Sequence, residues 1–135
     1  MSDRGSDGPL APRSPYGAEK AIGETYARLY GELHGLETVV LRYFNVFGPR
    51  QDPKSMYSGV ISKFTDDIKA GRTPTIFGDG QQTRDFVFVD DVVAVNLWFL
   101  QHPDKSGIFN LGTGRAQPFN DVAHAAVRSE ERRVG

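Results

Sequence analysis

The chain has 135 residues, of which 39% are hydrophobic and 24% are charged, values that are ordinary for a folded domain. Its formal net charge is -1, so no overall field directs it to nucleic acid or to an anionic membrane surface. It contains no cysteine, which excludes a disulfide framework and a thiolate metal site.

The sequence contains no apolar run close to the roughly 20 residues that a membrane-spanning helix needs. The first residues, MSDRGSDGPLAPRSP, are polar and rich in proline and glycine, and they lack the apolar core of a secretory signal. We therefore expect a cytoplasmic protein with neither a nucleic acid nor a membrane as its partner.

The first predicted element after a loop at residues 1–13 is a long helix. Ser14 and Pro15 form a good helix start, because a hydroxyl can cap the first turn and the fixed φ of proline suits it. The helix is expected to run to about His34, with Gly35 as its stop. Its apolar stripe consists of Ala21, Tyr26, Leu29, Tyr30 and Leu33.

The middle of the chain predicts a strand, a long loop, a helix and a second strand. The β-branched and aromatic residues of 37–46 (ETVVLRYFNV) indicate a buried strand. Residues 45–59 form a loop of a length that is usually functional. The apolar residues of 59–71 recur with helical period, and residues 73–78 (TPTIFG) predict a short strand before a turn at 79–80.

The last third alternates strands with helices. Residues 84–89 (RDFVFV) predict a strand, and Asp90 and Asp91 stand at the start of the helix that follows. Residues 107–114 (GIFNLGTG) predict a strand that runs into a glycine turn, and residues 119–127 begin a last helix. This alternation indicates an α/β fold with a mainly parallel sheet.

The final residues, RSEERRVG, are charged and have no hydrophobic period. They also resemble the translation of a common sequencing-library adapter. We therefore expect a domain at residues 1–128 that is followed by a non-native tail at residues 129–135. A solvated helix end is the alternative.

A tyrosine and a lysine four residues apart form the main catalytic candidate. Tyr16 and Lys20 lie in the first predicted helix, where positions i and i+4 share a face. An ammonium group beside a phenol favours the phenolate, which makes such a pair suitable for acid/base chemistry. The spacing alone is common by chance in helices, so other motifs must support it.

Four motifs together provide that support: SPYGAEK, LRYFNVFGP, FGDGQQTRDFVFVDDV and IFNLGTG. In this order and spacing they resemble the extended short-chain dehydrogenase/reductase family, specifically its NAD-dependent nucleotide-sugar epimerases and dehydratases. The resemblance covers residues 9–128. It implies a Rossmann-type α/β fold that is incomplete, with the C-terminal part of the NAD-binding domain and the substrate-binding part present. The Gly-rich turn that holds the pyrophosphate is expected to be missing.

The resemblance also assigns roles around the cofactor. It implies bound NAD, with Tyr16 as the base that takes a proton from a sugar hydroxyl during hydride transfer. Lys20 would hydrogen-bond the nicotinamide ribose and assist Tyr16, and Tyr43 would line the nicotinamide. In relatives the helix that carries Tyr16 belongs to a four-helix interface, so a homodimer is expected for the full-length enzyme.

Three further residues are candidates for binding the nucleotide sugar. Asn45 would contact the diphosphate by resemblance, and a turn-capping role is its alternative. Arg84 can bind phosphate oxygens in bidentate fashion, while a salt bridge with the neighbouring Asp85 is the alternative. Phe77 would stack on the nucleotide base, or else lie in the core.

Other polar residues point to structural roles. Adjacent positions on a helix do not face each other, so Asp90 and Asp91 are interpreted as helix caps rather than as a metal site. Arg42 is unusual in a buried strand and needs a carboxylate partner that the sequence does not identify. The histidines, which have no partner at ligand spacing, are expected at the surface; they are His34, His102 and His124.

The motifs differ in the substrate that they favour. Residues 48–64 resemble UDP-glucose or UDP-N-acetylglucosamine 4-epimerases, whereas residues 95–123 resemble ADP-glycero-manno-heptose 6-epimerase. We weight the first stretch more, because in the family it lies nearer the nucleotide sugar. A nucleotide-sugar 4,6-dehydratase remains an alternative, as does a truncated, inactive chain that shows no saturable binding of NAD+.

Overall fold

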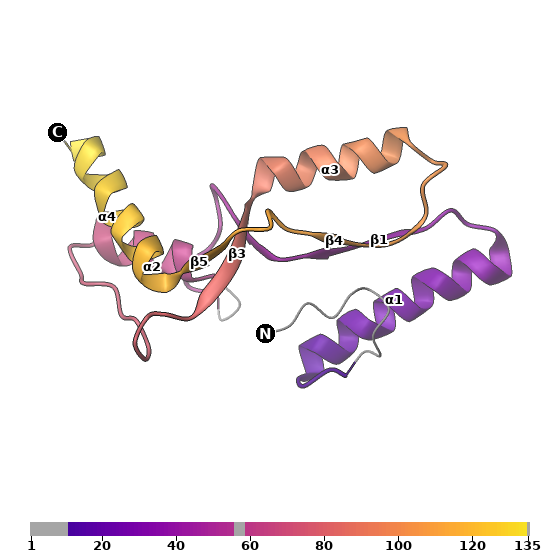
Figure 1. Ribbon diagram of the computed structural model, residues 1–135, viewed down its shortest axis with the longest axis horizontal. Helices are drawn as coiled ribbons and strands as arrows, with labels where there is room; N and C mark the ends of the chain where they lie inside the picture. Colours follow the sequence, from indigo (N-terminus) through magenta and orange to yellow (C-terminus); the bar gives the residue numbers. More distant parts are fainter. Residues whose placement is uncertain (1–10, 56–58, 135) are drawn as a thin grey trace. The chain divides into compact units, whose positions relative to one another are not determined.

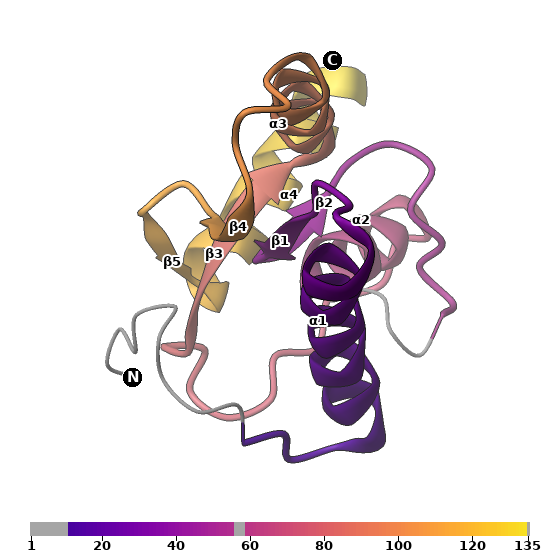
Figure 2. The same cartoon turned by 90° about the vertical axis from the view of Figure 1, so that its right-hand side faces the viewer.

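The computed structural model describes residues 11–55 and 59–134. The chain forms two compact units: unit 1 comprises Met1–Arg42 and Ala94–Leu111, and unit 2 comprises Tyr43–Val93 and Gly112–Gly135. The elements, labelled in Figure 1 and, for β2, in Figure 2, are α1 (Pro15–His34), β1 (Val39–Tyr43), β2 (Asn45–Phe47), α2 (Val60–Lys69), β3 (Thr83–Phe88), α3 (Val89–Gln101), β4 (Gly107–Leu111), β5 (Ala116–Pro118) and α4 (Phe119–Val134). Helices and strands alternate, which confirms the α/β class.

The start and stop of α1 lie where the sequence predicted them. The Ser14 hydroxyl accepts a hydrogen bond from the Gly17 N–H at 3.0 Å, and Pro15 opens the first turn. Gly35 ends the helix in the left-handed region with φ 66°, and its N–H donates to the Gly31 carbonyl at 3.0 Å. No residue of α1 is buried, and Leu33 in the apolar stripe is 72% exposed.

The predicted strand at 37–46 was wrong in two respects. It is split at Phe44, because the Val46 N–H turns back to the Phe44 carbonyl at 3.1 Å and interrupts the extended backbone. Its first part, β1, is also half-buried rather than buried. β1 pairs with β4 in a two-stranded sheet of unit 1.

The sheet of unit 2 has the order β2-β3-β5, and Figure 2 shows β3 between its two neighbours. β2 and β3 are parallel, with Asn45 opposite Phe86 and Phe47 opposite Phe88. β5 is antiparallel to β3, with Thr83 opposite Pro118. The sequence did not predict β5, since a three-residue segment ending in proline carries little strand signal.

The predicted strand at residues 73–78 was also wrong. This segment is irregular and pairs with no strand among the described residues. The turn at 78–80 is confirmed, with Gly80 at φ 73°. The Asn120 side chain lies so close to Gly80 that a Cβ there would collide with it, so only glycine fits this approach.

Helices α2 and α4 pack side by side in unit 2 (Figure 1). The buried core residues of this unit are Phe64, Val87, Val92 and Ala123, while Leu111 is the one buried apolar side chain among the described residues of unit 1. α4 continues through residues 129–134, where Lys69 and Glu130 approach to 4.0 Å. Residues 129–134 therefore form the end of a helix, as the alternative interpretation of the tail expected. The non-native origin of the tail stays a prediction.

Within the described ranges, no helix combines the length and the apolar character that crossing a membrane requires.

Candidate functional site

The candidate base lies at the exposed start of α1 in unit 1. The capping hydrogen bond of Ser14 fixes the first turn, and Tyr16 follows two residues later. The Lys20 ammonium lies 5.1 Å from the centroid of the Tyr16 ring, a cation–π distance. Tyr16 is 54% exposed, so a substrate hydroxyl can reach its phenol. The structure therefore brings the predicted pair together on one helix face.

Unit 1 is stabilised behind this pair by a forked ion pair. The Arg42 guanidinium donates two hydrogen bonds, both 2.8 Å long, to the two carboxylate oxygens of Glu24. This joins β1 to the middle of α1 and supplies the carboxylate that the sequence did not identify. The hydrogen bond from Arg42 holds the pKa of the Glu24 carboxyl below its ordinary value of 4.5, against the opposing effect of burial.

Asn45 and Tyr43 flank the break between β1 and β2. The Asn45 amide donates a hydrogen bond to the Asp85 carbonyl at 3.1 Å, so it links β2 to β3 rather than capping a turn. Tyr43 is 47% exposed. Phe44 is equally exposed, and its ring lies against Gly112.

Phe77 is presented to solvent by the irregular segment that precedes β3. Its side chain is 83% exposed, which overturns the alternative of a core phenylalanine. Its carbonyl accepts a hydrogen bond from the Gln82 side chain at 2.9 Å. The Asn120 amide donates to the Asp79 carbonyl at 3.1 Å and holds the same segment from α4. The ring is therefore exposed, while the backbone around it is fixed.

Arg84 is exposed on β3 in the same unit. Its Nη1 donates to the Thr83 carbonyl at 2.7 Å, and its guanidinium carbon lies 5.9 Å from the centroid of the Phe119 ring. Across the described ranges 11–55 and 59–134 it forms no ion pair, so the alternative of a salt bridge with Asp85 does not describe this structure. An exposed guanidinium without a carboxylate partner is suited to binding phosphate.

Asp85 instead organises the glycine turn after β4. Its carboxylate accepts hydrogen bonds from the Thr113 hydroxyl at 2.7 Å, the Thr113 N–H at 2.9 Å and the Gly114 N–H at 2.8 Å. Burial raises the pKa of the Asp85 carboxyl, but these hydrogen bonds, together with one from the Arg115 N–H, hold it below its ordinary value of 3.8. Asp85 therefore holds the backbone of this turn in place.

A hollow of about 370 Å³ opens beside Phe77, and its lining is mostly apolar. It is lined by Val60, Lys63, Phe64, Asp67, Thr75, Ile76, Phe77, Gln82 and Phe119. Of these residues, sequence reasoning proposed only Phe77 for ligand binding. It missed Lys63 and Phe119 among others, because no local pattern distinguishes them from ordinary helix residues.

Comparisons with known proteins identify the family. The sequence matches the NAD dependent epimerase/dehydratase family over residues 2–112. This chain is a member of that family. It is 50% identical over 114 residues to a putative UDP-glucose 4-epimerase of Methanocaldococcus jannaschii, which covers 84% of this chain and 36% of the relative.

Solved structures of the family show the same fold. One is the UDP-N-acetylglucosamine 4-epimerase of Methanobrevibacter ruminantium in complex with UDP-N-acetylmuramic acid, with 39% identity, a TM-score of 0.88, and coverage of 94% of this chain and 41% of that one. Another is the UDP-glucose 4-epimerase of Thermus thermophilus in complex with NAD, with 37% identity, a TM-score of 0.78, and coverage of 90% and 40%. The chain thus spans about 40% of the length of these relatives.

The family's cofactor fits the donors that unit 1 offers. Lys20 is exposed and carries three N–H donors, which suit the hydroxyl oxygens of a ribose, and the Tyr16 hydroxyl lies on the same face. The family is NAD-dependent by description, and the Thermus thermophilus relative holds NAD. Tyr16 and Lys20 are thus of the right chemistry to hold a nicotinamide ribose.

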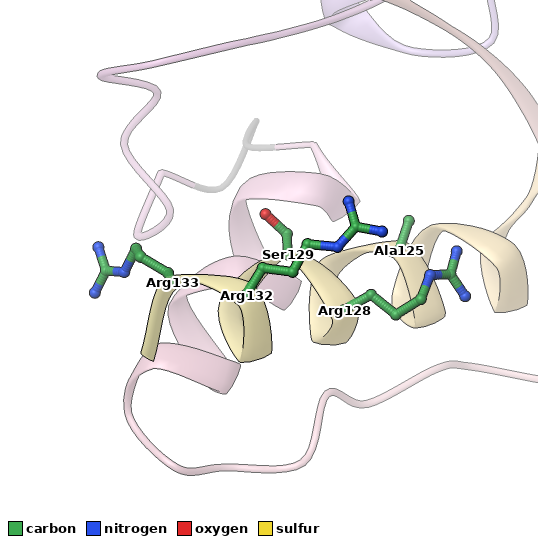
Figure 3. A pocket seen from close by; sticks show the side chains of 5 residues that line it. All are labelled: Ala125, Arg128, Ser129, Arg132 and Arg133. Carbon is green, nitrogen blue, oxygen red and sulfur yellow. The ribbon is translucent and has the colours of Figure 1, made fainter. Parts of the chain in front are cut away.

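Other polar groups show no sign of a second reactive site. Asp90 and Asp91 lie in the first turn of α3, as expected of caps, and the described residues contain no group of side chains that could hold a metal ion. A shallow hollow at the end of α4 is lined by Ala125, Arg128, Ser129, Arg132 and Arg133 (Figure 3). The Arg133 side chain points away from the other two arginines, and its Nε approaches Glu130 at 3.2 Å. Three of its five lining residues belong to the expected tail at residues 129–135.

Proposed function

We propose that this chain is part of a nucleotide-sugar epimerase of the UDP-glucose or UDP-N-acetylglucosamine 4-epimerase type. The observation that carries the proposal is the Tyr16–Lys20 pair, in which an exposed phenol lies against an ammonium group at 5.1 Å from ring centroid to nitrogen. The names of the relatives support a UDP-sugar as the substrate.

Tyr16 acts as the base in this proposal. Its phenolate oxygen takes the proton from the sugar hydroxyl, and Lys20 stabilises the phenolate by its charge. Bound NAD supplies a hydride acceptor and, in the reverse direction, a hydride donor. Tyr16 then returns the proton to the oxygen after the sugar has presented its other face. Lys20 in unit 1 and Tyr43 in unit 2 are the other residues that this proposal assigns to NAD binding.

Unit 2 provides the binding surface for the nucleotide. Arg84 offers an exposed guanidinium for the diphosphate, and Asn45 offers a side-chain amide. Phe77 offers an exposed ring at the edge of the 370 Å³ hollow, where a flat base can stack. These residues bind and orient, and none of them needs to transfer a proton.

The test is the turnover of a panel of nucleotide sugars by the full-length protein, meaning the complete reading frame that carries these residues. Nuclear magnetic resonance should show UDP-galactose forming from UDP-glucose, or the corresponding epimer from UDP-N-acetylglucosamine. Turnover of ADP-glycero-manno-heptose alone would contradict the proposal that the substrate is a UDP-sugar. A 4-keto-6-deoxy product would overturn the reaction type and indicate a dehydratase.

We also propose that the full-length protein is a homodimer that buries the exposed apolar residues of α1. Tyr26 is 60% exposed and Tyr30 is 50% exposed, which is unusual for a helix in a folded enzyme. Light scattering of the full-length protein measures its mass directly. A mass of two chains is expected, and the mass of one chain across the working concentration range would contradict the proposal.

A further inference from the structure

We propose that Phe119 is a positioning residue that holds the Arg84 guanidinium in place for the phosphates of the nucleotide substrate. The proposal deepens the proposed function and rests on it. Phe119 begins α4, and Arg84 lies on β3 of the same unit. The guanidinium carbon lies 5.9 Å from the centroid of the Phe119 ring, within the range of a cation–π interaction.

Within residues 11–55 and 59–134, Arg84 has few other restraints. Its guanidinium donates a hydrogen bond to the carbonyl of the preceding residue, Thr83, at 2.7 Å. The carboxylate next to it, Asp85, is occupied by the hydroxyl and N–H of Thr113 and by the N–H of Gly114. A long side chain in water loses rotamer entropy when it binds a ligand, so a restraint applied beforehand favours binding. The aromatic ring is the side-chain group that applies it.

Phe119 is itself held in position. Its N–H donates to the Gln82 carbonyl at 3.1 Å, and the N–H of Asn120 donates to the Gly80 carbonyl at 3.1 Å. The Phe86 ring packs near it, with 6.4 Å between the centroids. These contacts join the start of α4 to the segment that runs from Phe77 to Arg84. The ring is therefore a fixed support rather than a mobile side chain.

Phe119 also lines the hollow that contains Phe77. The Phe119 ring thus borders the proposed pocket for the base and also contacts Arg84, the residue proposed to bind the phosphates. Phe119 could either contact the base directly or support Arg84. If it supports Arg84, its substitution should weaken the binding of ligands that carry phosphate. If it contacts the base, the substitution should weaken the binding of ligands with and without phosphate alike.

The experiment measures the affinity of the full-length protein for UDP and for uridine by calorimetry. Phe119→Leu keeps an apolar side chain but removes the ring, and Phe119→Tyr restores the ring. We expect Phe119→Leu to weaken UDP binding about threefold to fivefold, the loss of one exposed cation–π contact. Uridine binding should change by less than about twofold, and Phe119→Tyr should bind UDP like the wild type.

Phe109→Leu is the matched control, because Phe109 lies in β4 of unit 1 and contacts Phe99. It should leave the affinity for UDP unchanged. In an Arg84→Gln background, Phe119→Leu should have no further effect on UDP binding, because the group that it positions is gone.

The outcomes separate the two levels of inference. If the wild type does not bind UDP, the proposed function fails. If the wild type binds UDP and Arg84→Gln weakens that binding, while Phe119→Leu binds UDP like the wild type, only the role of Phe119 fails. An equal loss of affinity for uridine and UDP in Phe119→Leu would also overturn it and indicate direct contact with the base.

Discussion

The two units fix their functional side chains in different ways. In unit 1 the geometry of Tyr16 and Lys20 follows from one helix turn and one capping hydroxyl, and no residue of that helix is buried. In unit 2 the residues around Arg84 and Phe77 are connected by side-chain hydrogen bonds, which the Asp85 carboxylate accepts and the Gln82 and Asn120 amides donate. The geometry of the proposed catalytic pair is thus encoded locally, whereas that of the proposed binding surface depends on contacts between distant segments.

The largest expected effect concerns the pair of Tyr16 and Lys20 in unit 1. Tyr16→Phe in the full-length protein removes the hydroxyl that exchanges the proton, so kcat for UDP-glucose should fall about 10²- to 10⁴-fold. Tyr26→Phe is the control, since it removes a phenol hydroxyl from the same helix outside the Tyr16–Lys20 pair. Steady-state kinetics would measure both variants. A kcat within about threefold of the wild type for Tyr16→Phe would remove this residue from the mechanism.

The next effect concerns the hydrogen bonds that the Asp85 carboxylate accepts in unit 2. Asp85→Ala leaves the hydroxyl and N–H of Thr113 and the N–H of Gly114 without their acceptor. The free energy of unfolding should fall by about 2–3 kcal/mol, as expected when hydrogen bonds to a charged group are lost. Urea denaturation would measure it, with Asp91→Ala in the exposed first turn of α3 as the control. Equal losses in the two variants would mean that the turn does not depend on Asp85.

A smaller effect should separate two ion pairs whose glutamates both lie on α1. Glu24 receives a forked pair of hydrogen bonds from Arg42, and both side chains are largely shielded, at 14% and 24% exposure. Glu32 pairs with Arg28 at 2.7 Å, but both of those side chains are more than half exposed. Glu24→Gln should therefore lower the free energy of unfolding by about 1–2 kcal/mol, and Glu32→Gln by no more than about 0.5 kcal/mol.

Together these two variants test whether shielding from solvent strengthens the ion pair of Glu24 and Arg42. If Glu32→Gln costs as much as Glu24→Gln, the shielding of the Arg42 fork has no energetic consequence. If neither variant has an effect, unit 1 does not depend on side-chain pairs at all. Chemical denaturation of both variants in the same buffer gives the difference directly.

The smallest effect is a dependence of stability on pH. The folded pKa of Glu24 lies below its ordinary value of 4.5, so its contribution is present above that pH and is lost as the pH falls through the lowered folded value. The wild type should therefore lose more stability than Glu24→Gln as the pH falls below about 4.5. Denaturation midpoints between neutral and acidic pH would measure this, and parallel curves would contradict it.

The sequence predicted the features that local chemistry determines. Ser14, Pro15 and Gly35 marked the limits of α1 because capping and φ preferences act within a few residues. The pair of Tyr16 and Lys20 followed from helix geometry alone. The α/β class followed from the alternation of strands and helices.

The features that the sequence did not predict depend on partners far along the chain. β5 exists because it pairs with β3 more than 30 residues earlier, and residues 73–78 lack such a partner despite their strand-like composition. Arg42 finds its carboxylate 18 residues away on α1. Phe119 lies under Arg84 only after β3 and the start of α4 come together. Propensity and period carry no information about such pairings.

The central claim is a division of labour, in which Tyr16 performs the chemistry and Arg84 binds the nucleotide. Calorimetric titration of UDP into the full-length wild type, Tyr16→Phe and Arg84→Gln tests it most directly. We predict that Tyr16→Phe binds UDP like the wild type and that Arg84→Gln binds it about tenfold more weakly, the loss of one charged hydrogen-bonding partner. Wild-type affinity in Arg84→Gln, or a comparable loss in Tyr16→Phe, would contradict the claim.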